Sequence, residues 1–144
     1  MVFLDTNVLV YAALEQDLRK QGIAAVILEH AREEAVGVIS LQVLREFANT
    51  LFRKSDYSPV QIRDIVSRFH NTYPCVSDSY EIQIHAIDIK AKYGLQFYDA
   101  IMLATAKAAG CDTVYSEDMG DGVVYDGITV KDPFKDCRTP SPNN

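Results

Sequence analysis

Four acidic residues stand where alternating strands and helices would bring carboxylates together. Asp5 ends a short apolar run at the start of the sequence, and Asp118 lies three residues beyond a second apolar run that ends at Tyr115. Glu46 falls within a segment of helical character, and Asp99 interrupts the otherwise almost wholly apolar sequence QFYDAIMLATA. Carboxylates gathered at one spot repel one another unless a cation neutralises them. The chemistry that this set predicts is therefore that of a bound divalent metal.

Each acid also has an ordinary structural interpretation. Asp5 could cap a following helix, and Glu46 could be a solvated helix residue. Asp99 could favour the positive end of a helix, and Asp118 could be a turn residue. Taken singly, these interpretations are preferred. The joint placement of all four at one edge of a sheet, two of them in apolar surroundings, favours a shared metal site.

The types of residue present indicate which metal to expect. Ligands that are all oxygen select Mg²⁺ or Mn²⁺ over zinc, and no Cys or His lies near these acids in the sequence. Cys75, Cys111 and Cys137 are an odd number without C-x-x-C spacing, which argues against a disulfide scaffold and a standard zinc site. The opening MVFLDTN has no basic n-region, and no apolar run approaches the roughly 20 residues of a membrane span. We therefore expect a cytoplasmic protein.

Apolar periodicity and turn residues predict a single α/β domain over 1–134, followed by a polar, disordered tail at 135–144. Strands are expected at 2–5, 36–39, 73–76 and 112–115, and within 123–130. Helices are expected at 8–14, 18–34, 41–54, 59–72, 79–93 and 97–109. Such alternation implies a parallel sheet of about 4–5 strands with helices on both faces. Working residues gather beyond the carboxyl ends of strands in sheets of this kind.

Two helix starts carry capping signals, and one helix carries a clear polar side. Capping boxes are predicted at Ser58 with Gln61 and at Asp78 with Glu81. In the helix over 41–54 the expected apolar stripe is Leu41, Leu44, Ala48, Leu51 and Phe52. The opposite, polar side is expected to hold Gln42, Glu46, Asn49 and Arg53. Glu46 is thus predicted to point away from the core.

The charge balance bears on nucleic-acid binding. The chain has 14 Lys and Arg against 20 Asp and Glu, for a formal charge of −6. Alone, this argues against phosphate contacts, but the balance becomes nearly neutral if four acids hold metal. The most basic stretch comprises Arg45, Arg53, Lys54, Arg63 and Arg68. Acids are interspersed in it, so an RNA phosphate track and an ordinary solvated face both remain open.

Four short segments in this order resemble a known family. LDTNVLVYA, LREF, FYDAIMLATA and SEDM, with the closing ITVKDPF, are similar to a PIN domain, and most to VapC-type toxin ribonucleases of type II toxin–antitoxin pairs. The resemblance runs from Val2 to about Phe134. It implies a three-layer PIN-like fold and four metal-ligating, catalytic acids: Asp5, Glu46, Asp99 and Asp118. It also implies supporting roles for Asn7 and Ser116, and a lesser one for Asp121, where only some members carry an acid.

This resemblance implies a magnesium- or manganese-dependent ribonuclease that hydrolyses phosphodiester bonds. A metal-activated water would attack the phosphate, leaving a 5′-phosphate and a 3′-hydroxyl. If the basic stretch is a phosphate track, Arg45, Arg53 and Lys54 would contact the RNA. Tyr98 could stack a base, although packing or an interface is the preferred interpretation. The resemblance further implies a homodimer, a small antitoxin protein from an adjacent gene, and no membrane association. An arginine of that antitoxin could enter the acidic pocket.

Three other functions fit part of the pattern. A phosphatase or receiver-type phosphoacceptor also uses acids at strand ends, but it would want a second acid beside Asp5 and a lysine soon after Tyr115. An inactive PIN scaffold would be expected to lack one of the four acids, and all four are present. A housekeeping RNA-processing PIN nuclease is an alternative that the sequence does not exclude. A small open reading frame immediately upstream would favour the toxin.

Overall fold

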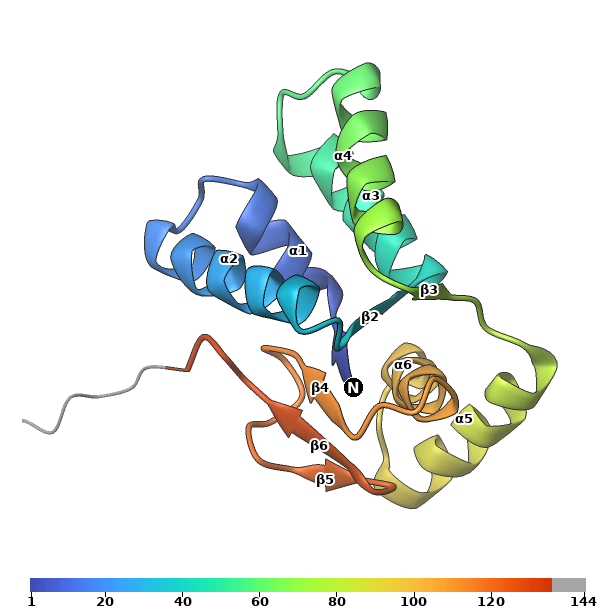
Figure 1. The fold of residues 1–144 in the computed structure, drawn as a ribbon. Coiled ribbons are helices and arrows are strands. Elements are labelled where there is room, and N and C mark those ends of the chain that lie inside the picture. Colours follow the sequence, from blue (N-terminus) through green and yellow to red (C-terminus); the bar gives the residue numbers. More distant parts are fainter. Residues whose placement is uncertain (136–144) are drawn as a thin grey trace, which may run out of the picture.

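The structure is a computed structural model in which residues 1–135 are described (Figure 1). Six strands and six helices follow one another in these residues. The strands are β1 (Val2–Leu4), β2 (Gly37–Ser40), β3 (Cys75–Val76), β4 (Thr113–Tyr115), β5 (Val124–Tyr125) and β6 (Ile128–Lys131). The helices are α1 (Thr6–Ala13), α2 (Leu18–Glu33), α3 (Leu41–Lys54), α4 (Pro59–Thr72), α5 (Tyr80–Tyr93) and α6 (Phe97–Ala108). Of the predicted tail, all but the first residue lies outside the described part of the chain.

The six strands form one sheet in the order β3-β2-β1-β4-β6-β5, and all pairs are parallel except β5 with β6. Helices α1 and α2 lie on one side of the sheet and α5 and α6 on the other, while α3 and α4 form a hairpin at the β2–β3 end (Figure 1). The predicted α/β architecture is confirmed, with six strands in place of the expected 4–5. The carboxyl ends of β1 and β4 are adjacent in the centre of this sheet.

The unexpected strand is β5, which pairs antiparallel with β6. The two are joined by Asp126-Gly127, whose φ values of +51° and +83° are those of a tight two-residue hairpin turn. An aspartate–glycine pair between apolar residues is a strong sequence signal for such a turn. The predicted parallel sheet thus has one antiparallel pair, at this edge, where a local turn determines the pairing.

The buried face of α3 differs from the predicted stripe. Its buried residues are Val43, Leu44, Phe47 and Leu51, whereas Leu41 and Phe52 are exposed. The face is rotated because α3 packs against both α1 and α4, and Phe47 contacts Phe69 of α4 edge to face at 5.2 Å. The predicted position of Glu46 on the polar side of α3 is confirmed, since Glu46 is exposed.

Of the two capping predictions, the one for α4 is confirmed and the one for α5 is wrong by one residue. Ser58 and Gln61 form the predicted reciprocal capping box of α4. At α5 the cap is Ser79, whose side chain accepts a hydrogen bond from the backbone N–H of Ile82, and the predicted pair of Asp78 with Glu81 is wrong by one position. Serine and aspartate both cap well, so two adjacent candidates leave the start of a helix ambiguous by one residue.

The core includes the central strands and the helices packed on them, and α6 is the helix with the longest buried run. Phe3 and Leu4 of β1 and Val114 of β4 are fully buried, and every residue of α6 from Ala100 to Ala106 is buried. A helix buried on so many sides is fixed rigidly on the sheet, and this sets the position of its first turn. None of the helices within residues 1–135 has the length and apolar character to cross a membrane.

Candidate active site

The four predicted acids come from four different elements and line one cavity of about 320 Å³. Asp5 directly follows β1, and Asp118 lies in the segment after β4. Since β1 and β4 are parallel neighbours with Leu4 opposite Tyr115, these two segments leave the sheet side by side. Glu46 projects from the exposed side of α3, and Asp99 from the first turn of α6. The fold thus brings together acids that are up to 113 positions apart in the sequence.

Asp5 is the most firmly held of these acids. One carboxylate oxygen, Oδ1, accepts a hydrogen bond from the backbone N–H of Thr6 at 2.7 Å, so Asp5 does cap α1. The other oxygen, Oδ2, accepts one from the Ser116 hydroxyl at 2.7 Å. Burial nevertheless raises the pKa of Asp5 to about 6, helped by the negative charges of Glu46 and Asp99. Asp5 therefore both caps α1 and lines the cavity of the four acids.

Glu46 is oriented by hydrogen bonds from two neighbouring side chains. The Thr6 hydroxyl donates to its Oε2 at 2.9 Å, and the Gln42 amide nitrogen donates to its Oε1 at 3.1 Å. Thr6 therefore bridges the two acids, with its backbone N–H on Asp5 and its hydroxyl on Glu46. Gln42 stands one helical turn before Glu46 on the same face of α3.

The carboxylates of Asp99 and Asp118 interact electrostatically with each other, and Asp99 also with Glu46. Burial raises the pKa of Asp99, and the carboxylates of Asp118 and Glu46 raise it further. The backbone N–H of Asp118 approaches the Ser116 hydroxyl oxygen at 3.4 Å. Ser116 is fully buried, and its hydroxyl links the segments that carry Asp5 and Asp118. The four acids thus interact as one negatively charged unit.

The residues of this cavity fit a hard divalent cation by their chemistry. In residues 1–135 no three Asp, Glu, His or Cys side chains converge as a ready-made metal cage. The donors that line the cavity are nonetheless carboxylates with hydroxyl and amide oxygens, which suit Mg²⁺ or Mn²⁺. Asn7 also lines the cavity, and its side-chain Oδ1 is buried with no hydrogen-bond partner among the described residues. A cation would offset both the mutual repulsion of the acids and this unpaired oxygen.

Asp121 does not line the cavity. Its Oδ1 accepts a hydrogen bond from the backbone N–H of Asp132 at 3.0 Å, and its Oδ2 pairs with the Lys135 ammonium at 3.3 Å. These partners lower the pKa of Asp121, with the backbone bond the larger cause. The loop after Asp118 therefore turns this acid toward the end of β6.

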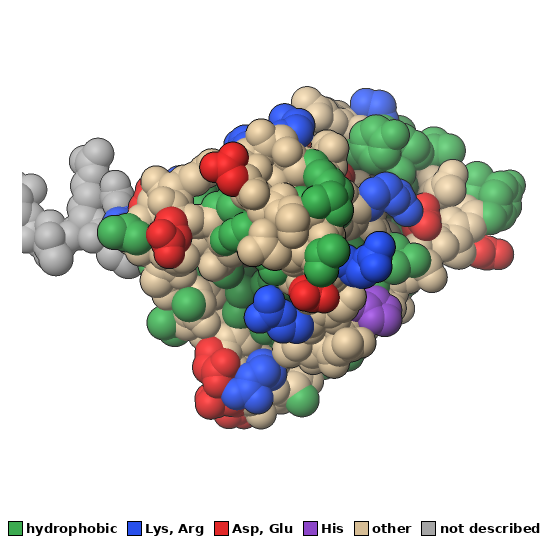
Figure 2. All heavy atoms as spheres, turned by 90° about the horizontal axis from the view of Figure 1, so that it is seen from above, with side chains coloured by type: hydrophobic (Ala, Val, Ile, Leu, Met, Phe, Trp, Pro, Cys, Tyr) green, Lys and Arg blue, Asp and Glu red, His purple; other side chains and the backbone are tan. Residues whose placement is uncertain are grey.

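Two of the three predicted basic residues reach the site. Arg53 and Lys54, in the last turn of α3, line the same cavity as the four acids, whereas Arg45 does not. The helical face seen in Figure 2 mixes basic, acidic and apolar side chains without a continuous basic patch. Tyr98 is exposed and, together with Asp5, Glu46 and Asp99, lines a smaller cavity beside the main one.

Several cavity residues were missed by the sequence analysis. Thr6 stands inside the quoted DTN segment, and Gln42 stands four residues before Glu46, so both carried a signal that helical and strand-end spacing could have revealed. The remaining members come from α1, the following loop and α3. They were not predicted as site residues: Val10, Tyr11, Gln16 and Thr50.

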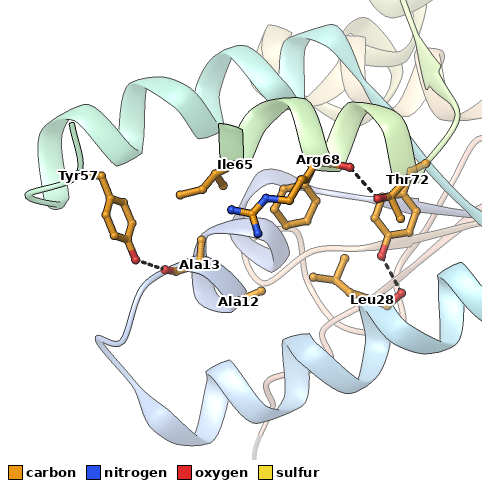
Figure 3. A pocket seen from close by; sticks show the side chains of 9 residues that line it. Ala12, Ala13, Leu28, Tyr57, Ile65, Arg68 and Thr72 are labelled. Carbon is orange, nitrogen blue, oxygen red and sulfur yellow. Dashed lines mark hydrogen bonds between the residues drawn. The ribbon is translucent and has the colours of Figure 1, made fainter. Parts of the chain in front are cut away.

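A larger and more apolar groove, of about 410 Å³, lies between α4 and the α1–α2 pair (Figure 3). The hydroxyls of two tyrosines tie its ends together. Tyr57 donates to the Ala13 carbonyl at 3.1 Å, and Tyr73 donates to the Leu28 carbonyl at 2.7 Å. The Arg68 guanidinium points into the groove from α4 (Figure 3). This groove is separate from the four acids.

A family model for the PIN domain matches residues 2–120. The chain belongs to the PIN domain family. The match contains the four clustered acids together with Asn7 and Ser116, and it ends just before Asp121. This PIN domain has no match in a search of curated proteins.

Solved structures of similar fold include toxins of toxin–antitoxin pairs. VapC20 of Mycobacterium tuberculosis, described as a toxin that cleaves the sarcin–ricin loop, is 20% identical over 82% of this chain and 90% of its own, with a TM-score of 0.67. A toxin–antitoxin complex from Klebsiella pneumoniae is 18% identical over 93% and 98%, with a TM-score of 0.64. VapBC2 of Rickettsia felis, bound to promoter DNA, is 15% identical over 91% and 98%, with a TM-score of 0.68. At these identities the likeness establishes the fold.

Proposed function

We propose that this PIN domain is a metal-dependent endoribonuclease and the toxin of a type II toxin–antitoxin pair. The observation that carries the proposal is that four carboxylates from four segments line one cavity. The match to the PIN family and the fold likeness to VapC toxins support it. An inactive scaffold would have no need to keep four mutually repelling acids together.

Asp5, Glu46, Asp99 and Asp118 would hold Mg²⁺ or Mn²⁺. When bound, the cation supplies an activated water and neutralises the charge that develops on the phosphate. Thr6 and Ser116 hold Asp5 in a fixed orientation, and Thr6 does the same for Glu46. Preset carboxylates lose little conformational entropy on binding, which favours both affinity and correct placement of the scissile phosphate.

The RNA backbone would enter along the end of α3. Arg53 and Lys54 line the cavity on its α3 side, and cations there can contact phosphates on either side of the scissile bond. The exposed ring of Tyr98 stands at the adjoining small cavity, where it could stack an unpaired base. Since such an enzyme acts on cellular RNA, the proposal places it in the cytoplasm.

The test of this proposal is cleavage of a single-stranded RNA by the purified protein. Cleavage should require Mg²⁺ or Mn²⁺, stop with a chelator, and leave 5′-phosphate and 3′-hydroxyl ends. Asp5→Asn should abolish it while the protein stays folded. Undiminished cleavage in excess chelator would overturn the metal mechanism. Sequencing RNA ends after brief expression of the parent and of Asp5→Asn would identify the target.

An antitoxin partner would find its docking surface in the groove between α4 and the α1–α2 pair. The groove is lined mainly by apolar side chains and contains one guanidinium, so it suits an apolar segment that carries an acidic group. Ile65→Asp should weaken binding to the product of the adjacent small gene, measured by calorimetry. Unchanged affinity would show that the partner binds a different surface. Lack of such a gene would favour a housekeeping PIN nuclease.

The homodimer belongs to the same proposal. Tyr80, Ile84 and Ile87 of α5 are exposed at spacings of four and three residues, which places them on one helical face. A second copy could bury this face. Ile84→Asp should convert a dimer into a monomer in analytical ultracentrifugation, and a dimer that persists would exclude this face.

A further inference from the structure

The segment that carries Asp118 is anchored on one side by the sheet. The backbone N–H of Ser116 donates to the Lys131 carbonyl at 3.0 Å, and that of Asp5 donates to the Tyr115 carbonyl at 3.1 Å. Beyond Ser116 the chain leaves the strand, and Asp118 itself is exposed. The direction of its carboxylate therefore depends on its neighbours: on the Ser116 hydroxyl, which the Asp118 N–H approaches at 3.4 Å, on the buried Met119, and on what holds Glu117.

Glu117 is held by side chains of two helices. The Lys20 ammonium, from α2, donates to Glu117 Oε1 at 2.9 Å, and the Tyr11 hydroxyl, from α1, donates to the same oxygen at 3.1 Å. Lys20 also donates to the Tyr11 hydroxyl at 3.1 Å and lies 4.7 Å from the centre of its ring. The three groups form a closed triangle of hydrogen bonds.

The triangle is shielded enough to be stiff. The side chains of Lys20 and Glu117 are 23% and 25% exposed, and an ion pair screened in this way is stronger than one at the open surface. Tyr11 is fixed on its other side by the ring of Phe134, edge to face at 4.8 Å. Tyr11 also lines the cavity of the four acids, so the triangle adjoins the site directly.

We propose that Glu117 is a positioning residue: clamped by Lys20 and Tyr11, it fixes the 116–118 segment so that Asp118 faces Asp5 and Asp99. One carboxylate oxygen of Glu117, Oε1, is occupied by these two partners, while the other, Oε2, is buried with no hydrogen-bond partner among the described residues. The inference rests on the proposed function, and it deepens that function by naming what presets the fourth carboxylate. Helices α1 and α2 would thus act on the proposed metal site through the side chain of Glu117.

Lys20→Met is the most discriminating variant, because two explanations predict opposite signs. If Lys20 acted only by its charge, removing a cation near four carboxylates would tighten Mn²⁺ binding. If it clamps Glu117, the loosened segment should weaken Mn²⁺ binding by about 10-fold or more, as substitutions of groups that orient metal ligands typically do. The measurement is Mn²⁺ binding by electron paramagnetic resonance, which needs no catalytic turnover.

Tyr11→Phe tests the same clamp without changing any charge. It removes the hydroxyl but keeps the ring, so the contact with Phe134 survives. We expect a smaller loss of Mn²⁺ affinity, in the same direction as for Lys20→Met. In RNA cleavage, both variants should need more Mg²⁺ for half-maximal rate while kcat at saturating Mg²⁺ changes little. This variant decides the question if Lys20→Met does not fold.

The matched control is Lys107→Met. Lys107 forms an ion pair with Asp126 at 3.0 Å, at the β5–β6 turn, and its loss removes the same charge by the same substitution. Mn²⁺ affinity should stay at the parental value there. A charge-reversed double variant, Lys20→Glu with Glu117→Lys, should recover part of the affinity that Lys20→Met loses.

The outcomes separate this inference from the proposed function. Parental or tighter Mn²⁺ binding by folded Lys20→Met, or an equal loss in Lys107→Met, would overturn the positioning role alone. Failure of the parent to bind Mn²⁺ would overturn the proposed function and the positioning role with it. Weaker binding in Lys20→Met and Tyr11→Phe, with Lys107→Met unchanged, would support both.

Discussion

Replacing Asp5 with asparagine should stabilise the metal-free protein by an amount that grows with pH. Folding raises the pKa of Asp5 from 3.8 to about 6, mainly through burial. Between these values the native state binds more protons than the unfolded state, so the free energy of unfolding falls as pH rises. The asparagine side chain does not ionise. The free energy of unfolding of Asp5→Asn therefore does not decrease with pH in this way.

The size of the effect follows from the two pKa values. A difference of about two units, at 1.36 kcal/mol each, corresponds to a total of about 3 kcal/mol. About 2 kcal/mol of it should develop between pH 4 and pH 7. The asparagine side chain also alters the hydrogen bonds from Thr6 and Ser116, but that contribution does not depend on pH. The difference in the free energy of unfolding between Asp5→Asn and the parent should therefore change with pH only through the ionisation of Asp5.

The assay is urea unfolding in the presence of a chelator, at a series of pH values from 4 to 8. Asp121→Asn is the matched control, because neighbours lower the pKa of that acid. The ionised Asp121 stabilises the native state at neutral pH, and this contribution is lost as pH falls. Asp121→Asn should therefore lower the free energy of unfolding at neutral pH and have less effect at acidic pH. Added Mg²⁺ should stabilise the parent and not Asp5→Asn. A difference between Asp5→Asn and parent that stays constant across the pH series would refute the reasoning.

Other substitutions test the remaining parts of the site and the packing beneath it. Asp118→Asn should abolish RNA cleavage, whereas Asp121→Asn should retain most of it at saturating Mg²⁺; equal losses would bring Asp121 into the metal site. Arg53→Ala with Lys54→Ala should raise KM several-fold, leave kcat nearly unchanged, and flatten the dependence of KM on salt, since fewer phosphate contacts release fewer counterions. A Cβ at Gly37 would meet a side-chain carbon at 2.9 Å. Gly37→Ala should therefore lower the free energy of unfolding by about 1–3 kcal/mol in urea titrations, and a neutral effect would show that this contact relaxes freely.

Local sequence signals determined the elements that carry the site. Apolar runs and capping residues predicted β1, β4, α3 and α6 within one or two residues of their observed ends. Such signals suffice because helix periodicity and caps depend on neighbours in the chain. With a parallel sheet assumed, they also predicted that Asp5 and Asp118 lie at one edge. The Asp126-Gly127 turn was equally local, and a closer interpretation of it would have predicted β5.

Only the tertiary structure decided how the acids are oriented and which ones belong together. Ser116 meets Asp5 across 111 positions, Glu117 meets Lys20 across 97, and Thr6 meets Glu46 across 40. Asp121 stands three residues from Asp118, yet it turns toward Lys135 and away from the cavity. Residue type and spacing could not separate these two acids, because both are loop aspartates in the same short segment. Asp121 contacts Asp132 and Lys135 beyond β6, whereas Asp118 lines the cavity beside Asp5, and these contacts exist only once the chain has folded.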